Sequence, residues 1–292
     1  MKNFEIITDS CCNLTEEAID KLDVHILSLA YIINDVENFS YIKGQVFDNK
    51  AFYNKLRSKV KASTSQVTTT QAIELVKPLL EQGRDVLYIG FSSALSGTFS
   101  AVKVAFDQLK NEFVDRQIIA VDTLSAAAGQ AILVKKTCKM RDEGKSIEDA
   151  RTWLEDNKMK VCIWFTIDDL FYLQRGGRIS GAKAVIGAML SVKPILAFDN
   201  EGKLRPVGKA KGRKRSVDYL LDKLQEHLSP KEGQDVFVMH GNAPEEAELL
   251  KQRIEVSTKV NSVEIVFLEP VIAVHGGPGT MGVAFLGKER SI

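Results

Sequence analysis

The chain has 292 residues, of which 45% are hydrophobic and 26% are charged, and its formal net charge is +1. This composition is typical of a folded globular protein and excludes a mainly disordered chain. The near-zero net charge also gives the protein no bulk attraction to nucleic acid or to an anionic membrane surface.

The first half of the chain alternates short apolar runs with amphipathic segments. The apolar runs predict four strands, namely Phe4–Thr8, Val24–Leu29, Val86–Gly90 and Gln117–Asp122. Helical spacing predicts four helices: one capped by Thr15, one that starts near Asp48, one over Ala72–Glu81 that Pro78 is able to kink, and one that carries Phe99 and Leu109. Strands that are apolar at successive positions are covered on both faces. We therefore expect a parallel sheet flanked by helices.

The second half predicts a mixed sheet. The expected strands are Val161–Thr166, Pro194–Phe198, Lys203–Ala210, Asp235–His240 and Ser262–Leu268, and the expected helices are Ile179–Leu190, Arg213–Leu228 and Pro244–Ser257. The segment from Asp199 to Gly202 is a strong turn signal, so the second and third of these strands form an antiparallel hairpin. We expect an α/β protein with two domains, residues 1–159 and 160–292, with the boundary shortly after the amphipathic segment Ile147–Leu154.

Several classes of protein are excluded by what the sequence lacks. Its four cysteines form no CxxC pair, so they indicate neither a zinc site nor a disulfide framework. The opening residues MKNFEIITDS lack the basic and apolar regions of a signal peptide, and no stretch approaches the roughly 20 apolar residues of a membrane span. We therefore expect a cytoplasmic protein with reduced thiols and no membrane span.

Two hydroxyl-rich segments lie where a parallel sheet is expected to bind ligands. The segment FSSALSGTFS carries Ser96, Gly97 and Thr98 at a helix start, where free N–H groups and the helix dipole favour an anion. The segment TSQVTTT, which begins with Thr64 and Ser65, precedes another helix and has five hydroxyls in seven residues. A helix cap explains one hydroxyl of each segment. The excess indicates that both segments converge on one anion, although simple capping remains open.

Other candidate residues are weaker in isolation. His275 leads into the segment GGPGT, where backbone can approach a ligand closely, and a tight turn with a surface histidine explains it equally well. Arg175 and Arg178 flank two glycines, which suits bidentate oxyanion contact or a carboxylate bridge between domains. Asp9 ends the first strand and can orient the hydroxyls, bind a metal or cap a turn. His240 ends a later strand and is a candidate to line a cleft.

The sequence contains no catalytic triad, P-loop, HExxH motif or convincing pair of catalytic carboxylates. It offers oxyanion donors without an evident general base or nucleophile, and we interpret Cys11 and Cys12 as packing residues. The basic run Lys209–Arg215 is most simply a solvated face, because it has no interleaved aromatic residues to stack on bases. These patterns favour a protein that holds an anion without a metal or other cofactor.

Seven segments together resemble the DegV family in sequence and in order. They are IITDSCCNLTEE, TSQVTTTQ, FSSALSGTFSAV, VDTLSAAAGQ, DDLFYLQRGGRISGAKAVIG, KGRKRS and HGGPGTMGVAF, and they span nearly the whole chain. Members of that family are known as bacterial fatty acid-binding proteins, and some serve as the binding subunit of a fatty acid kinase. One departure is Val67, which stands where family members commonly have proline and makes the loop less rigid.

The resemblance implies a long-chain fatty acid in a buried tunnel of the C-terminal domain, with its carboxylate at the domain junction. It implies that Thr64, Ser96 and His275 bind the carboxylate. It gives supporting roles to the residues around them, namely Ser65, Gly97, Thr98, Arg175 and Arg178. It also implies that the basic run around Arg213 faces a separate kinase subunit, which phosphorylates the bound acid with ATP.

Two other functions remain open from the sequence. An enzyme of the phosphoryl- or acyl-transfer class would use Asp9, Ser96 or His275 directly and would bind nucleotide or turn over substrate by itself. A regulatory protein would contact nucleic acid through Lys209–Arg215 with strong salt dependence, which a net charge of +1 disfavours. We favour a fatty acid carrier without catalytic turnover and without a nucleic acid partner.

Overall fold

A computed structural model describes residues 3–179 and 192–290 of the chain. Its first large sheet, sheet A, is parallel and has the strand order β2-β1-β6-β7. The four strands are β1 (Glu5–Asp9), β2 (His25–Leu27), β6 (Val86–Gly90) and β7 (Ile118–Asp122). β1 and β6 are buried at every position. The apolar run of β6 predicts this, whereas in β1 the burial includes the polar residues Glu5, Thr8 and Asp9.

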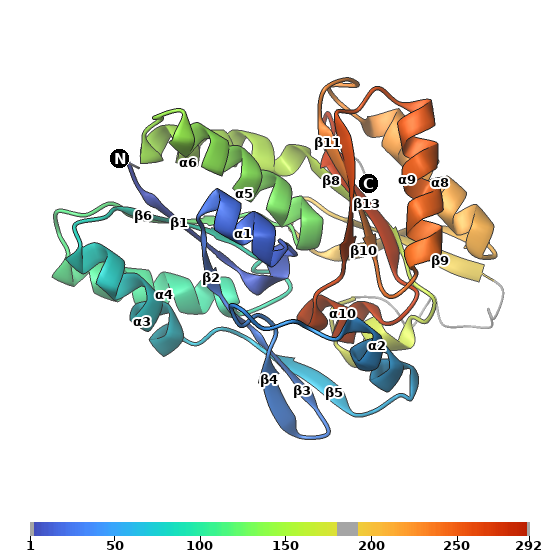
Figure 1. Ribbon diagram of the computed structural model, residues 1–292, viewed down its shortest axis with the longest axis horizontal. Coiled ribbons are helices and arrows are strands. Elements are labelled where there is room, and N and C mark those ends of the chain that lie inside the picture. The colour runs from blue at the N-terminus through green and yellow to red at the C-terminus, as the bar shows by residue number, and fades with distance from the viewer. Residues whose placement is uncertain (1–2, 180–191, 291–292) are drawn as a thin grey trace.

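Helices cover both faces of sheet A (Figure 1). α5 (Ala127–Asp142) and α6 (Ile147–Asn157) lie on one face, and α3 (Thr69–Glu81) and α4 (Thr98–Glu112) lie on the other. α1 (Glu16–Leu22) begins at the predicted cap Thr15, whose hydroxyl accepts a hydrogen bond from Ala18 N at 3.2 Å. α3 continues through Pro78. The flanked parallel sheet is therefore confirmed, and α5 is a helix that the sequence analysis missed.

The second large sheet, sheet C, has the strand order β10-β9-β8-β13-β11-β12. Its strands are β8 (Val161–Thr166), β9 (Val192–Phe198), β10 (Leu204–Lys211), β11 (Asp235–His240), β12 (Ser262–Phe267) and β13 (Met281–Leu286). β11 and β12 pair in parallel and the other neighbours are antiparallel, so the sheet is mixed as predicted. α8 (Arg213–His227) and α9 (Pro244–Ser257) cover one face, and the opposite face turns toward sheet A.

The predicted hairpin is formed by β9 and β10. The Asp199 carboxylate accepts two backbone N–H bonds within the turn, both at 2.9 Å. Gly202 closes the turn with a φ of +74°, a conformation that glycine adopts without strain. The Ser92 hydroxyl donates to Gly202 O at 2.9 Å, so the turn of this hairpin is docked on the loop that follows β6.

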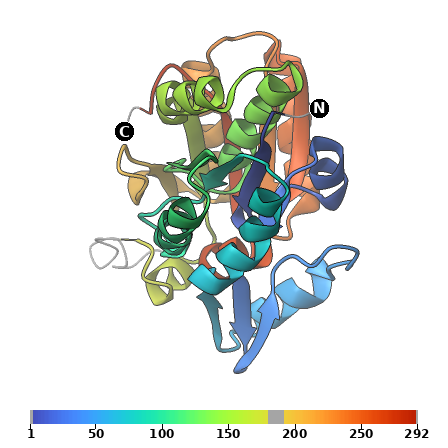
Figure 2. The same cartoon turned by 90° about the vertical axis from the view of Figure 1, so that its left-hand side faces the viewer.

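A third, small sheet was not predicted. β3 (Ala30–Ile33) pairs antiparallel with β4 (Val36–Phe39) and with β5 (Ala62–Ser65), and α2 (Asn49–Arg57) accompanies them. This unit projects below the two large sheets in both ribbon views (Figures 1 and 2). Asn34 and Asp35 both have positive φ, as a two-residue hairpin turn requires, and this Asn-Asp pair was the available signal.

Three further elements were missed, namely the helices α7 (Phe171–Arg175) and α10 (Pro270–Gly276) and the central strand β13. The helix expected over Ile179–Leu190 lies outside the described residues apart from Ile179. The domain boundary between residues 159 and 160 stays a prediction, and it falls in the short helix η2 (Lys158–Lys160) between α6 and β8. None of the helices within residues 3–179 and 192–290 combines the length and the apolar composition needed to cross a membrane.

Candidate ligand-binding site

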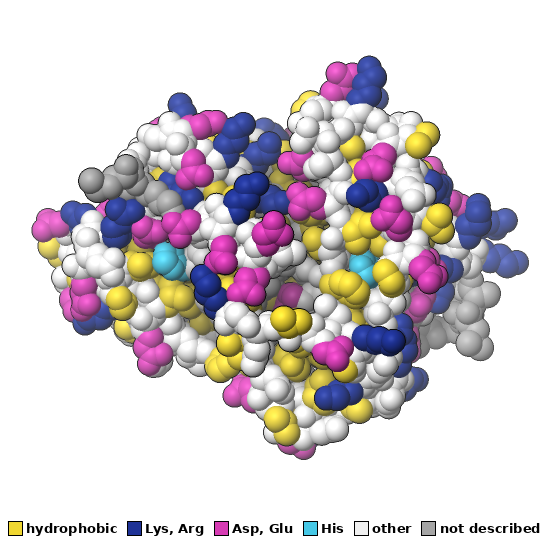
Figure 3. Space-filling model, in the orientation of Figure 1, with side chains coloured by type: hydrophobic (Ala, Val, Ile, Leu, Met, Phe, Trp, Pro, Cys, Tyr) yellow, Lys and Arg dark blue, Asp and Glu magenta, His cyan; other side chains and the backbone are white. Residues whose placement is uncertain are grey.

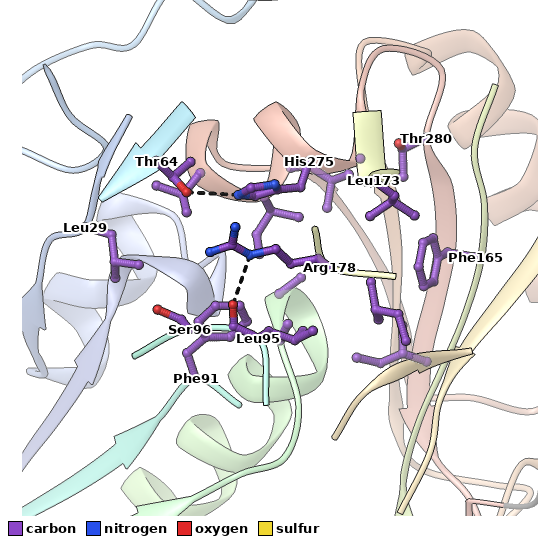
Figure 4. Close-up of a pocket in the computed structure, with 18 of the residues that line it drawn as sticks. Leu29, Thr64, Phe91, Leu95, Ser96, Phe165, Leu173, Arg178, His275 and Thr280 are labelled. Carbon is purple, nitrogen blue, oxygen red and sulfur yellow. Dashed lines mark hydrogen bonds between the residues drawn. The ribbon is translucent and has the colours of Figure 1, made fainter. Parts of the chain in front are cut away.

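A cavity of about 320 Å³ lies between the carboxyl edge of sheet A and the inner face of sheet C (Figure 4). Most of its wall is apolar, and side chains from both halves contribute, among them Phe91, Ala126, Ile163, Phe165, Phe198 and Met239. Its volume falls within the range of roughly 300–1,000 Å³ that is usual for small-molecule sites. The cavity belongs to the junction of the two halves, and residues 160–292 alone do not form it.

Polar groups gather at one end of the cavity. Six of the predicted site residues line it, namely Thr64, Ser65, Ser96, Gly97, Arg178 and His275. Figure 4 shows Thr64, His275, Arg178 and Ser96 around the same space, although they are far apart in the sequence. Gln66 also lines this end and was missed, because a glutamine next to a hydroxyl-rich segment has no distinctive pattern of its own.

The start of α4 presents Ser96 and Gly97 to the cavity. The Ser96 hydroxyl accepts a hydrogen bond from Thr98 N at 3.2 Å and donates to Thr98 Oγ1 at 3.0 Å. Thr98 is buried and does not line the cavity; its hydroxyl accepts from Val67 N at 3.2 Å. A Cβ at position 97 would overlap the Gln66 amide, so a larger residue there would displace that side chain from the polar end. Thr98 therefore links the two hydroxyl-rich segments from a buried position outside the cavity.

Thr64 reaches the site from a strand and not from the start of a helix as expected. It lies in β5, where it pairs with Tyr31 of β3, and α3 begins only at Thr69 after its cap Thr68. The expectation was wrong because the hydroxyl-rich segment is shared between two elements: its first two residues extend the small sheet, and only the later threonines serve the helix.

His275 lies in the last turn of α10 and not in a glycine loop as expected. Glu269 caps this helix and Gly277, with a φ of +79°, ends it. His275 Nε2 lies 2.9 Å from Thr64 Oγ1, whereas Nδ1 is buried without a partner among the described residues. Burial lowers the pKa of His275 to about 3, with a further contribution from the nearby Arg178 charge. The imidazole is therefore neutral at physiological pH.

Arg178 brings a positive charge to the polar end. Its Nε donates to Leu95 O at 3.1 Å, and its Nη1 donates to Gly176 O at 2.5 Å. The first bond crosses from the C-terminal half to the loop before α4 (Figure 4). Because carbonyls orient the guanidinium and no described carboxylate lies within ion-pair distance of it, its charge is available to an anion in the cavity.

Arg175 is placed differently from Arg178. Its guanidinium packs over the rings of Phe171 and Tyr172 at 5.5 Å and 5.4 Å and donates to Val60 O at 3.3 Å. It does not line the cavity. Its charge still contributes to the lowered pKa of His275, so its influence on the site is electrostatic.

Asp9 is fully buried behind the cavity wall. Its carboxylate accepts four hydrogen bonds of 2.8–3.1 Å, from Cys11 N, Tyr88 Oη, Phe91 N and Gln130 Nε2. Burial raises the pKa of Asp9 to about 6. All four donors belong to the protein, and the carboxylate does not line the cavity. Asp9 therefore connects β1, β6 and α5, and its role is structural.

The remaining candidates lie outside the cavity. His240 is buried, accepts a hydrogen bond from Ala243 N at 3.1 Å and does not line the cavity. Cys11 and Cys12 are buried free thiols, in keeping with a packing role. Within residues 3–179 and 192–290, no group of three or more His, Cys, Asp or Glu side chains is arranged to hold a metal ion.

The basic run Lys209–Arg215 spans the end of β10 and the start of α8. Arg213 is occupied internally: its Nε donates to Glu246 at 2.7 Å and its Nη1 donates to Gly279 O at 2.6 Å. The other basic residues of the run are exposed. On the face drawn in Figure 3, acidic and basic side chains are interspersed over the whole surface.

The chain is similar in sequence to known proteins along nearly its whole length. The model of the DegV family, described as an uncharacterised protein family, matches residues 3–288. A DegV domain-containing protein of Clostridium perfringens is 40% identical over 290 residues, which is 99% of each chain. The DegV domain-containing protein YteA of Lactococcus lactis is 32% identical, with 98% of each chain covered.

Solved structures of DegV family proteins have the same fold as this chain. DegV of Bacillus subtilis, described as a fatty acid binding protein, is 29% identical with a TM-score of 0.85 over 99% of this chain and 100% of its own. A fatty acid binding DegV family protein of Streptococcus agalactiae is 27% identical with the same TM-score and the same coverage. A DegV family protein of Thermus thermophilus, described by its fatty acid binding, has a TM-score of 0.88 at 25% identity, over 98% and 100%. This chain belongs to the DegV family.

Proposed function

We propose that this protein binds a long-chain fatty acid in the cavity between its two large sheets, with the carboxylate at the polar end. The observation that carries the proposal is the division of one cavity into a largely apolar wall and, at one end, a cluster of hydroxyl, amide and guanidinium donors. A fatty acid has the same division. The fatty acid binding described for the structural relatives supports this assignment.

The energetics favour an acid with a long chain. Burial of about 14 methylenes contributes roughly 11 kcal/mol of gross transfer free energy, at about 0.8 kcal/mol each. An unpartnered carboxylate taken out of water costs several kcal/mol. The hydroxyls of Thr64 and Ser96, the charge of Arg178 and the amides at the start of α4 offset this cost. The neutral His275 supports the site by holding Thr64 at 2.9 Å.

We further propose that the protein is a carrier that presents the acid to a separate ATP-dependent kinase in the cytoplasm. The kinase would transfer the γ-phosphoryl group of ATP to a carboxylate oxygen, giving acyl phosphate and ADP. Two features support a non-catalytic role. Ser96 bonds to Thr98 and has no hydrogen bond to a described histidine or carboxylate that could act as its base, and the resemblance to the DegV family includes binding subunits of such kinases.

Mass spectrometry of an organic extract of the purified protein tests the binding proposal directly. We expect a co-purifying long-chain acid in stoichiometric amount. Ser96→Ala should reduce the amount retained by about tenfold, since it removes a hydrogen bond to a charged group. Absence of any acyl chain from the wild-type protein, even after incubation with free acids, would refute the proposal. Formation of acyl phosphate by the isolated chain with ATP would instead identify an enzyme.

A further inference from the structure

Three residues form a continuous row across the middle of sheet C. Phe165 of β8, Gly282 of β13 and Met239 of β11 are direct cross-strand partners. All three are buried and line the cavity. Since side chains alternate between the two faces of a sheet, this row points away from α8 and α9 and toward the ligand space. We call these three residues the far-wall row.

The middle member of the far-wall row lets its two neighbours pack closely over it. A Cβ at Gly282 would lie 2.9 Å from Phe165 Cβ, 3.0 Å from Met239 Cε and 3.1 Å from Trp164 O. Such distances are shorter than ordinary carbon contacts, so no other residue fits without a shift of its neighbours. The glycine therefore allows the Phe165 and Met239 side chains to close over it, so that a rigid phenyl ring and a flexible methionine form this part of the cavity wall.

The far-wall row lies opposite the polar end of the cavity. Figure 4 shows Phe165 on one side of the cavity, and Thr64, Ser96 and Leu29 on the other. An acid whose carboxylate binds near Thr64 and Ser96 therefore extends toward the far-wall row. The structure assigns to Phe165, Gly282 and Met239 the role of a length gauge, which receives the terminal methyl group and sets the longest chain that fits. This inference rests on the proposed function.

Each further methylene adds to the binding free energy only until the chain reaches the far-wall row. Each methylene that is buried strengthens binding about fourfold, which corresponds to about 0.8 kcal/mol. A chain that reaches the far-wall row gains nothing from a further carbon unless Met239 moves, because interiors are close-packed. Affinity should therefore rise with chain length to an optimum and then fall, and the size of residue 239 should set that optimum.

The test compares Met239→Ala with Leu29→Ala in the full-length protein. Both substitutions remove three heavy atoms from a buried residue that lines the cavity. Leu29 lies beside the polar end (Figure 4), whereas Met239 belongs to the far-wall row. Each protein, stripped of lipid, is incubated with an equimolar mixture of straight-chain saturated acids with even carbon numbers, and the bound acids are quantified by mass spectrometry. Met239→Ala should move the optimum about two carbons longer. Leu29→Ala should weaken all acids and leave the optimum in place.

A second pair of variants keeps the inference testable if Met239→Ala does not fold. Met239→Phe should move the optimum shorter, and Phe165→Leu should move it longer. An unchanged optimum in the folded far-wall variants, with acid still bound, would overturn the length gauge and leave the proposed function intact. An equal shift in Leu29→Ala would also overturn it. A wild-type protein that binds no acid at all would refute the proposed function itself.

Discussion

Arg178 is the residue that we expect to recognise the negative charge of a bound acid. Two carbonyls hold its guanidinium at the polar end of the cavity. We expect Arg178→Met to weaken binding of palmitate by about tenfold to a hundredfold, since hydrogen bonds to charged groups contribute about 1.5–3 kcal/mol. Binding of hexadecanol, which has the same chain without the carboxylate, should stay close to that of the wild type. Fluorescence displacement measures both, and equal losses for acid and alcohol would contradict the assignment.

His275 makes the stability of the fold depend on pH. Its pKa in the folded protein is about 3, below its ordinary value of 6.5, chiefly because of burial. Between these two values the unfolded chain binds a proton that the folded chain does not. The free energy of unfolding therefore decreases as pH falls through this window, by at most about 1.4 kcal/mol per pH unit from this residue.

Replacement of the imidazole should remove this pH dependence. In urea titrations at pH 7, 6 and 5, the free energy of unfolding of His275→Asn should fall less steeply than that of the wild type. Buried carboxyls such as Asp9, whose raised pKa gives the opposite sign, are common to both proteins and cancel in the difference. Parallel pH profiles of the two proteins would show that His275 titrates normally in the folded state.

At the scale of elements, the hairpin β9–β10 is a link between the two large sheets. Its turn residue Gly202 has positive φ, and a Cβ there would overlap the Ser92 hydroxyl that holds the turn. Gly144 also has positive φ but has open space where its Cβ would be. We expect Gly144→Ala to cost about 1 kcal/mol of unfolding free energy through backbone strain alone. Gly202→Ala should cost about 1–2 kcal/mol more, because it also displaces Ser92.

Chemical denaturation of the two alanine variants measures this difference. Equal destabilisation would mean that the docked turn adds nothing to the stability of the fold. A decrease in bound acid for Gly202→Ala alone would additionally connect the turn with the cavity, since Phe198 and Leu204 on either side of it line the cavity wall.

The elements that could be predicted from the sequence are those whose burial is indicated by the apolar pattern of their own residues. β6 is apolar at successive positions, β1 contains two adjacent isoleucines, and the predicted helices of both halves repeat apolar residues at helical spacing, so their type follows from local pattern. β5 could not be recognised in this way, because Ala62–Ser65 is polar and is a strand only through its pairing with β3. For this reason Thr64 was expected at a helix start.

α10 had local signals that the sequence analysis did not use. Glu269 accepts hydrogen bonds from Val271 N and Ile272 N, Pro270 follows it as the first helical residue, and Gly277 ends the helix. An acidic cap, a proline at the first position and a glycine after the last are together typical of a short helix. The glycines after His275 suggest a loop by themselves, which is why a loop was expected there.

At the scale of the whole molecule, the cavity exists only because the two halves dock. Its polar end combines Ser96 from the N-terminal half with Arg178 and His275 from the C-terminal half. Nothing in a single stretch of sequence encodes the distance between these residues. The hydroxyl-rich and glycine-rich motifs could therefore be identified as candidates, whereas their meeting point depends on the packing of sheet A against sheet C.

Arg290 is a candidate to stabilise the contact between the two halves. It is 7% exposed, and its guanidinium donates to carbonyls from both halves and the connection between them, namely Thr123, Leu124, Lys158, Val161 and Asp199. Burial lowers its pKa to about 10, so it stays charged at physiological pH. Arg290→Met would leave these carbonyls without their donor, and we expect a loss of about 3 kcal/mol of unfolding free energy.

Arg141 provides the matched control, because its buried side chain also donates to backbone carbonyls, but only to those of Leu22 and Asp23 in the N-terminal half. Arg141→Met should lower the unfolding free energy by a similar amount without loosening the junction. Dissociation of a fluorescent fatty acid, followed by stopped flow under conditions where both variants are folded, separates the two effects. We expect faster release from Arg290→Met and wild-type release from Arg141→Met. Since the cavity wall belongs to both halves, release that is equally fast in both variants would mean that general destabilisation, and not opening of the junction, controls the escape of the ligand.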